Sequence, residues 1–317
     1  MTSSLHPSRA VPAHRPRISV IVPAFQRPAS LHRCLLALAG QELDRRLFEV
    51  VVCDDGSEPP IEASLEAVRD RLPADLAVTV VRQENAGPAA ARNRAAAEAR
   101  GHFLAFTDDD CEPAPAWLSR LLVRLESRPG TMVGGGIRNG LDGEPFASAT
   151  QAIMDFAYAE RERDDAVRLF CTSNLAVPSG PFRELGGFSE SFPFAAGEDY
   201  DFCWRWHEAG HPAVYASEAV VVHRHGGTWS SYLRQHFGYG RGLQQVRRRR
   251  RARLGSIRDP RYGFVARMIL HPLASPPRNL RTSALIGLSQ LATAAGAVTE
   301  ALRPASLRAP VHASGGR

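Results

Sequence analysis

The sequence predicts an α/β fold, a mostly parallel sheet flanked by helices, followed by a basic helical C-terminal extension. Continuous β-branched runs such as Ile18–Val22 are typical of strands buried on both faces. Strand and helix patterns alternate four times in about 90 residues, which favours βαβ units. Arginine is concentrated at the C-terminal end: residues 1–240 carry 24 Arg against 31 acidic residues, whereas residues 241–317 carry 15 Arg against two.

The elements follow in order along the chain. Leu31, Leu35 and Leu38 recur at helical spacing behind Ser30, a residue suited to an N-cap. The first apolar run ends at Pro23, and the second, 48–53, leads directly into Asp54-Asp55-Gly56-Ser57. We expect strands at 18–22, 48–53, 77–81, 102–106 and 219–222, helices at 62–72, 89–100, 147–160, 201–208 and 228–253, and a flexible break at 134–136.

Composition excludes several functions. All 39 basic residues are arginine, so no lysine is available for a Schiff base, for pyridoxal phosphate or for a Walker A loop. The five cysteines are widely spaced and match no zinc pattern, which favours a reduced, cytoplasmic setting. Polar residues interrupt the apolar stretch 284–302, so we expect no transmembrane segment. We expect residues 1–16 to form a disordered lead.

Carboxylates follow two of the predicted strands. Asp54 and Asp55 end the second strand, and Asp108, Asp109 and Asp110 follow the fourth. In open α/β sheets the ligand crevice lies at these carboxyl ends. Three adjacent carboxylates repel one another unless a cation is near, and oxygen ligands suit Mg²⁺ or Mn²⁺. An acidic turn before the next helix explains the same residues, so the cluster alone leaves both interpretations open.

Five ordered motifs together resemble the inverting family 2 glycosyltransferases, whose fold is the Rossmann-like GT-A fold. The resemblance covers roughly residues 17–230 and implies donor and acceptor halves at about 17–112 and 113–230, with 231–317 as the basic extension. The motifs are the opening ISVIVPAFQRP, the strand-loop VVVCDDGS at 50–57, the segment NAGPAAARN at 85–93, the cluster 108–110, and SNLAVPSGPFRELGGF at 173–188 followed by GEDYDFCWRW at 197–206.

The resemblance implies a nucleotide-sugar donor site. Asp55 matches the aspartate that binds the base, which favours UDP, and Asp110 and Asp108 match the acidic pair that binds Mn²⁺ or Mg²⁺, with Asp108 also near the donor. A histidine near the position of His223 often helps to bind metal in relatives. The other donor-side positions implied are Pro23, Ala24, Phe25, Arg92, Asn93 and Asn174.

The acceptor side follows from the last motif. Asp199 matches the general base, which takes the proton of the acceptor hydroxyl, and Glu198 accompanies it in the catalytic motif. An acidic helix N-terminus is a compatible structural role for the same pair. Gly187, Trp204 and Arg205 are the implied acceptor contacts.

The expected function is transfer of a sugar to a glycan or lipid-linked saccharide, in polysaccharide or cell-wall biosynthesis. Gln235–Tyr239 stands where processive members carry QxxRW and lacks that motif, which favours transfer of one sugar or a few. The run Arg247–Arg251 favours anionic partners. It could contact the inner face of an anionic membrane at the periphery, or it could simply be solvated, and both interpretations stay open. Specific nucleic-acid binding is not expected. Two alternatives stay open: a sugar nucleotidyltransferase, and a non-catalytic GT-A-like binding protein recruited by its arginine-rich tail.

Overall fold

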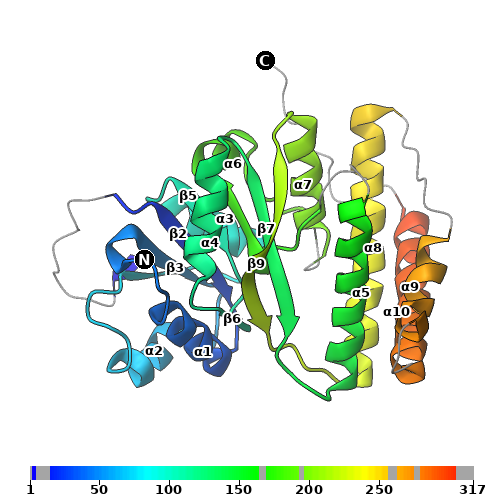
Figure 1. The fold of residues 1–317 in the computed structure, drawn as a ribbon, viewed down its shortest axis with the longest axis horizontal. Coiled ribbons are helices and arrows are strands. Elements are labelled where there is room, and N and C mark those ends of the chain that lie inside the picture. The colour runs from blue at the N-terminus through cyan, green and yellow to red at the C-terminus, as the bar shows by residue number, and fades with distance from the viewer. Residues whose placement is uncertain are drawn as a thin grey trace. The chain divides into compact units, whose positions relative to one another are not determined.

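The computed structural model describes residues 2–4, 15–163, 169–192, 196–255, 263–274 and 279–304 (Figure 1). The strands are β1 (Thr2–Ser4), β2 (Ile18–Ala24), β3 (Phe48–Asp54), β4 (Val78–Arg82), β5 (Phe103–Phe106), β6 (Cys111–Pro113), β7 (Met132–Asn139), β8 (Leu175–Pro178) and β9 (Ala213–His223). The helices are α1 (Pro28–Ala39), α2 (Ile61–Arg69), α3 (Pro88–Glu98), α4 (Trp117–Ser127), α5 (Pro145–Arg163), α6 (Ser179–Glu184), α7 (Glu198–Glu208), α8 (Trp229–Leu254), α9 (Phe264–Ala274) and α10 (Leu280–Leu302), with short 3-10 helices η1 (Arg45–Leu47) and η2 (Thr172–Asn174).

The chain divides into two compact units. Unit 1 comprises Met1–Gly140, Arg168–Glu190 and Phe202–Arg224, and it contains every strand found in the described residues. Unit 2 comprises Leu141–Val167, Ser191–Asp201 and His225–Arg317. Unit 2 thus takes in α5 and the segment before α7 as well as the C-terminal helices, so it begins earlier in the sequence than the predicted extension.

Unit 1 is built on one nine-stranded sheet of order β1-β4-β3-β2-β5-β8-β7-β9-β6. Strands β4, β3, β2 and β5 are parallel, and β7 is parallel to β9, whereas β8, β1 and β6 pair antiparallel with their neighbours. Helix α3 packs on β2 and β3, and α4 packs on β7 and β9 (Figure 1). The predicted α/β class is therefore confirmed, with a mostly parallel sheet in its first half.

The first helix begins earlier than its predicted cap. Helix α1 starts at Pro28, and Arg27 stands at the N-cap without a side-chain capping bond. Proline suits the first helical position because its fixed φ is already helical and its missing N–H would have no partner there. Ser30 consequently lies inside the first turn, where its hydroxyl accepts from Arg33 at 3.1 Å.

The glycines at 134–136 form no break. They lie in the middle of β7 and are buried. A Cβ on Gly134 would lie 2.1 Å from Cδ1 of Phe170, and one on Gly135 would lie 2.3 Å from Nδ2 of Asn174. The prediction of flexibility was wrong because glycine here admits close neighbours instead of providing a hinge.

The N-terminal lead also differs from expectation at one place. Residues Thr2–Ser4 form β1 and pair antiparallel with β4, Thr2 opposite Val81. Residues 5–14 lie outside the described residues. The expected disorder therefore does not hold for the first strand, whose backbone groups find partners on an otherwise open sheet edge.

Unit 2 is helical and has its own apolar cluster of Ala149, Phe156, Tyr232, Met268, Leu285 and Ile286. Helix α8 begins with a capping box: Thr228 accepts from the backbone of Ser231, and the Ser231 hydroxyl accepts from the Thr228 backbone N–H at 2.8 Å. The helix predicted over 228–253 is thus confirmed, and the structure identifies Thr228 as its N-cap. Helix α8 lies beside α10 (Figure 1), and a Cβ on Gly240 would lie 1.8 Å from the carbonyl oxygen of Thr293.

By length and composition, α10 could cross a membrane, and it is the only such helix among the described residues. Its interrupting polar residues had predicted no spanning segment. A single helix of this kind is weak evidence, because core helices of other proteins pass the same test.

Candidate functional site

The acidic cluster lies at the carboxyl edge of the parallel strands of unit 1. Asp108, Asp109 and Asp110 occupy the connection between β5 and β6, next to the loop that follows β2. The cluster is largely enclosed: Asp109 has no exposed surface and Asp110 is 7% exposed. Carboxylates in such a place are costly unless cations neutralise them.

Arg27 supplies part of that neutralisation. It projects from the loop between β2 and α1, and its guanidinium lies 2.5 Å from Oδ1 of Asp109 and 2.6 Å from Oδ2 of Asp110. Burial raises the pKa of Asp109 to about 7, although the charge of Arg27 acts in the opposite direction. Sequence reasoning missed Arg27. The available signal was a lone cation at the carboxyl end of the strand that pairs with β5.

His223 is brought to the same cluster by strand pairing. In the antiparallel pair of β6 and β9, Cys111 lies opposite His223, so the preceding residue, Asp110, lies beside the imidazole. Nε2 of His223 is 3.3 Å from Oδ1 of Asp110. Burial lowers the pKa of His223, but its hydrogen bond to Asp110 and the charges of Asp110 and Asp108 outweigh burial, and the net pKa is raised.

Arg92 covers the other side of the cluster. It lies on α3, is 5% exposed, and donates from Nη2 to Oδ1 of Asp108 at 2.7 Å. A buried arginine in an Ala/Arg helix is not a solvated surface residue, since arginine is rarely buried unless paired. The structure therefore brings together four of the predicted donor or metal positions: Arg92, Asp108, Asp110 and His223.

Asp55 is fixed at the end of β3 by three hydrogen bonds. Its Oδ1 accepts from Nε2 of Gln83 at 2.8 Å and from the backbone of Ala86 at 2.9 Å, and its Oδ2 accepts from the backbone of Gly87 at 2.9 Å. Each carboxylate oxygen can accept further bonds, so a ligand donor can still be recognised. Asp54 serves the loop itself, because it accepts from Ser57 and Ile61.

The three residues predicted beneath a base differ in exposure. Pro23 and Ala24 are buried at the end of β2, where they pair with Cys53 and Asp54. Phe25, the next residue, is 43% exposed. Only the phenyl ring of this group therefore presents a large apolar surface to solvent.

Asn93 and Gly187 meet directly. The amide of Asn93 accepts from the backbone N–H of Phe188 at 2.9 Å and donates to its carbonyl at 2.8 Å. A Cβ on Gly187, whose φ is +66°, would lie 2.6 Å from Oδ1 of Asn93. Arg205 holds the same turn, since it donates to the carbonyls of Leu185 and Gly187, each at 2.7 Å. The predicted donor residue Asn93 and acceptor residues Gly187 and Arg205 thus share one turn, and Trp204 is half-buried nearby in sequence.

Asn174 lies inside the sheet. Its Oδ1 accepts from Nε1 of Trp117 at 2.8 Å, and its Nδ2 donates to the carbonyls of Gly136 and Ala219 at 2.8 and 2.9 Å. With 1% exposure, this amide joins α4, β7 and β9, whereas the sequence had suggested a donor contact.

Glu198 and Asp199 begin α7 in unit 2. Three acidic residues in the first turn complement the helix dipole. Glu198 is buried, and Oδ1 of Asp199 accepts from the backbone of Tyr200 at 2.7 Å. Helix α8 passes close behind, because a Cβ on Gly242 would lie 2.2 Å from the carbonyl oxygen of Ala196. The backbone of α8 therefore fixes the segment that leads into Asp199.

The basic run of α8 is also held by this segment. Arg249 is buried, its guanidinium lies 4.4 Å from the ring centroid of Phe192, and it donates to the hydroxyl of Ser191. The alternative interpretation of this run as fully solvated is therefore wrong for Arg249.

The donor set of unit 1 fits a divalent cation. Carboxylate oxygens from Asp110 and Asp108 and an imidazole nitrogen from His223 are ligand types that Mn²⁺ and Mg²⁺ sites use. Two arginines already pair with these carboxylates, Arg27 with Asp110 and Arg92 with Asp108, so a metal ion there would compete with their guanidinium groups.

Comparisons with known proteins place the chain in a family. The model of a family described as "Glycosyl transferase family 2" matches residues 19–186. A pre-mycofactocin glycosyltransferase of Mycobacterium tuberculosis is 31% identical over 220 residues, which is 68% of this chain and 44% of the relative, so the chain spans less than half of that protein. Glycosyltransferase AglE of Haloferax volcanii is 27% identical over 237 residues, covering 73% of this chain and 74% of the relative.

A solved structure shares the fold. The mannosyltransferase PcManGT from Pyrobaculum calidifontis, in complex with GDP-Man and Mn²⁺, superposes with a TM-score of 0.64 at 22% identity, over 92% of this chain and 88% of that one.

Proposed function

Because the chain belongs to glycosyl transferase family 2, we propose that it transfers a sugar from a nucleotide-sugar to an acceptor hydroxyl, with inversion at the anomeric carbon. The observation that carries this proposal is the cluster of Asp108, Asp110, His223 and Arg92 at the carboxyl edge of the sheet. The family match and the fold of a mannosyltransferase that binds GDP-Man and Mn²⁺ support it.

In this proposal the donor base lies at Asp55. Its carboxylate is oriented by Gln83 and two backbone amides, so its remaining acceptor capacity has a fixed direction. A carboxylate accepts from the ring N–H of uracil and from guanine as well. We favour UDP, with Phe25 as the apolar contact and Pro23 and Ala24 forming the loop floor.

The residues that would hold the cation are Asp110, Asp108 and His223. When bound, Mn²⁺ or Mg²⁺ supplies charge stabilisation for the departing diphosphate. Arg27 pairs with Asp110 and Arg92 with Asp108, and both carry guanidinium groups suited to phosphate oxygens. Asn93, another proposed donor-side residue, holds the turn at Gly187 and Phe188 through two hydrogen bonds to Phe188.

Asp199 is the proposed general base. An acceptor hydroxyl is a poor nucleophile until a carboxylate accepts its proton as the new C–O bond forms. Attack from the face opposite the departing diphosphate inverts the anomeric centre. Glu198, buried beside it, completes the motif, and Gly187, Trp204 and Arg205 belong to the proposed acceptor side.

The proposed acceptor is a glycan or a lipid-linked saccharide, in polysaccharide or cell-wall synthesis at the cytoplasmic side of the membrane. A nucleotidyltransferase is disfavoured because the loop 23–28 has neither glycine nor lysine. The following experiment distinguishes the enzyme from the alternative, a non-catalytic binding protein.

Nucleotide binding provides the test. Thermal stability would be measured with UDP, GDP and dTDP, with and without Mn²⁺, for the wild type, Asp110→Ala and the exposed control Asp142→Ala. Ligand at 100 times its Kd stabilises by about 2.7 kcal/mol. Metal-dependent stabilisation lost only in Asp110→Ala supports the donor site. Preference for GDP contradicts the uracil assignment, and no binding of any nucleotide favours the non-catalytic protein.

A further inference from the structure

Helix α10 exposes mainly apolar residues and buries several polar ones, which is the reverse of an ordinary surface helix. Of its seven buried residues, four are polar. Of its eleven exposed residues, nine are apolar. The buried polar residues are Thr282, Ser283, Ser289 and Glu300, and the exposed apolar residues are Leu280, Ala284, Leu288, Leu291, Ala294, Ala295, Val298, Ala301 and Leu302. A helix in contact with water normally shows the opposite arrangement.

Six of the exposed residues form one continuous line, here called the α10 stripe: Ala284, Leu288, Leu291, Ala295, Val298 and Leu302. They follow one another at intervals of four, three, four, three and four, which keeps them on one side of the helix. Leu291, Val298 and Leu302 are 69%, 58% and 78% exposed. On α9, which packs against α10, Val265 and Leu270 are also exposed. A continuous line of exposed apolar residues such as the α10 stripe is the kind of surface that marks an interaction site.

The buried side of α10 is tied to α8. The Tyr232 hydroxyl donates to the carbonyl of Leu285, and Arg241 and Gln245 donate to the carboxylate of Glu300, at 2.9–3.2 Å. A Cβ on Gly296 would lie 2.0 Å from the carbonyl oxygen of Phe237, so the two backbones approach closely. The contact partners have increasing residue numbers along both helices, so α8 and α10 run parallel.

This attachment decides how α10 can meet a bilayer. Helix α8 carries Arg241 and the run Arg247–Arg251, and arginine is expensive in the hydrocarbon core. Moving α10 across the core would bring α8 with it or break the Glu300 contacts. A helix with one apolar face and a tethered polar face instead lies in the plane of the interface.

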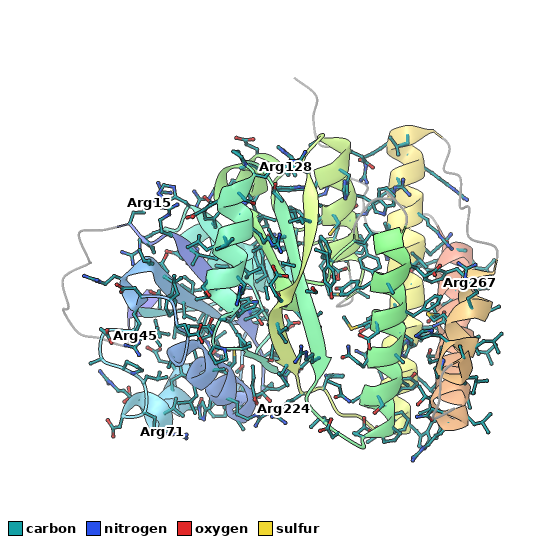
Figure 2. All side chains as sticks on the ribbon, viewed as in Figure 1. Arg15, Arg45, Arg71, Arg128, Arg224 and Arg267 are labelled. Atoms are coloured by element: carbon teal, nitrogen blue, oxygen red, sulfur yellow. The ribbon has the colours of Figure 1, made fainter. Side chains whose placement is uncertain are left out.

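Charge identifies the surface that it would meet. In the described parts of α8, α9 and α10 the only acidic residue is Glu300, and it is buried. Exposed arginines lie on the same two helices as the apolar residues: Arg281 at the start of α10, and Arg267 on α9 (Figure 2), which also pairs with Glu160 of α5. A second copy would present the same positive charges, whereas anionic headgroups complement them.

We propose that the α10 stripe, with Val265 and Leu270 of α9, docks unit 2 in the plane of an anionic lipid bilayer. The stripe inserts below the headgroups and the arginines of these two helices contact the phosphates. This goes beyond the proposed sugar transfer and does not depend on it, because the argument uses no donor-site residue.

Vesicle binding by the full chain tests the proposal. Flotation would use vesicles of phosphatidylcholine alone and with 30% phosphatidylglycerol, a composition of about one charged lipid in three. The variant Leu291→Glu/Val298→Glu changes two highly exposed stripe positions, and Val123→Glu, at the 65%-exposed Val123 of α4, is the matched control. Unchanged helix content and melting temperature would show that each variant folds.

The proposal expects the wild type to bind the anionic vesicles. Binding should fall at least tenfold in the stripe variant, which loses inserted apolar surface, and stay within about twofold of the wild type in the control, which keeps it. Binding that is equal in both variants overturns it, as does the absence of binding. Light scattering gives the remaining outcome: a dimer of the wild type that the stripe variant abolishes assigns the stripe to a second copy and also overturns the proposal.

Discussion

Arg27 and Asp110 form an ion pair at 2.6 Å between the loop after β2 and the loop after β5. The same guanidinium reaches Asp109, which has no exposed surface. One arginine therefore neutralises two carboxylates of the candidate metal and diphosphate site, at the place where a divalent cation is proposed to bind.

Replacing Arg27 should destabilise the metal-free protein and increase its response to metal. In Arg27→Met, Asp109 loses its paired cation, and leaving a buried acceptor unsatisfied costs about 1–3 kcal/mol. Added Mn²⁺ should then raise the melting temperature by more than in the wild type, because a competing cation is gone. Arg33→Met is the control, since Arg33 is similarly exposed and lies 3.3 Å from Glu112. Equal responses of the two variants to Mn²⁺ would contradict this account.

Replacing Asp199 should separate turnover from donor binding. In Asp199→Asn the proposed base is lost, and general base catalysis contributes about 10²–10⁴-fold to rate. Metal-dependent nucleotide affinity should stay at the wild-type value, because the donor-site residues are unchanged. Single-turnover rates and calorimetry with UDP check both parts, and Asp142→Asn is the control. Retained turnover in Asp199→Asn would remove this residue from the base role.

Two glycines of α8 should respond oppositely to alanine. In Gly240→Ala the new Cβ would lie 1.8 Å from the carbonyl oxygen of Thr293, so α8 and α10 must separate, at a cost of about 1–3 kcal/mol. In Gly238→Ala nothing lies within 4 Å of the new Cβ, and the helix should gain up to about 1 kcal/mol. Chemical denaturation measures both. A neutral Gly240→Ala would show that the two helices do not pack this closely.

His236 should make unit 2 less stable in acid. Burial lowers its pKa to about 4, and its Nε2 has no hydrogen-bond partner among the described residues. Between about pH 6.5, the ordinary histidine value, and pH 4 the unfolded chain binds the proton and the folded chain does not. The free energy of unfolding therefore falls as pH is lowered through this window, by at most about 3 kcal/mol.

Denaturation curves at pH 7.5, 6 and 5 would measure this loss. His236→Phe should remove the part due to this residue, since the phenyl ring keeps the contacts with Tyr232 and Tyr239 without a titrating group. His102→Phe, at an exposed position, should leave the pH dependence as it is. The same slope in His236→Phe and the wild type would assign the acid sensitivity to other groups.

Local patterns predicted most of the fold. The β-branched runs at Ile18–Val22 and 48–53 are strands because they are buried on both faces, and Thr228 caps α8 because its hydroxyl has a backbone donor three residues on. Arg27 could not be identified from the sequence, because its closeness to Asp110 depends on the pairing of β2 with β5, a strand distant in sequence. His223 was identified only through family resemblance, and its contact with Asp110 depends on β6 pairing with β9.

The roles of one glycine and one asparagine could not be predicted from local sequence patterns. Gly134 suggests flexibility in isolation, and only the ring of Phe170 reveals that the position excludes a side chain. Asn174 lies in a family motif, and only its three buried partners reveal a structural role. In both cases the deciding neighbour comes from a distant segment that sequence spacing cannot place.

The three hydrogen bonds of Asn174 also bear on the order of folding. Its partners Trp117, Gly136 and Ala219 are 57, 38 and 45 residues away along the chain. Closing loops of that length costs entropy before the bonds form, so such contacts assemble slowly. This junction would therefore close after contacts within one helical turn, such as the Thr228–Ser231 cap, and weakening it should accelerate unfolding more than it slows folding.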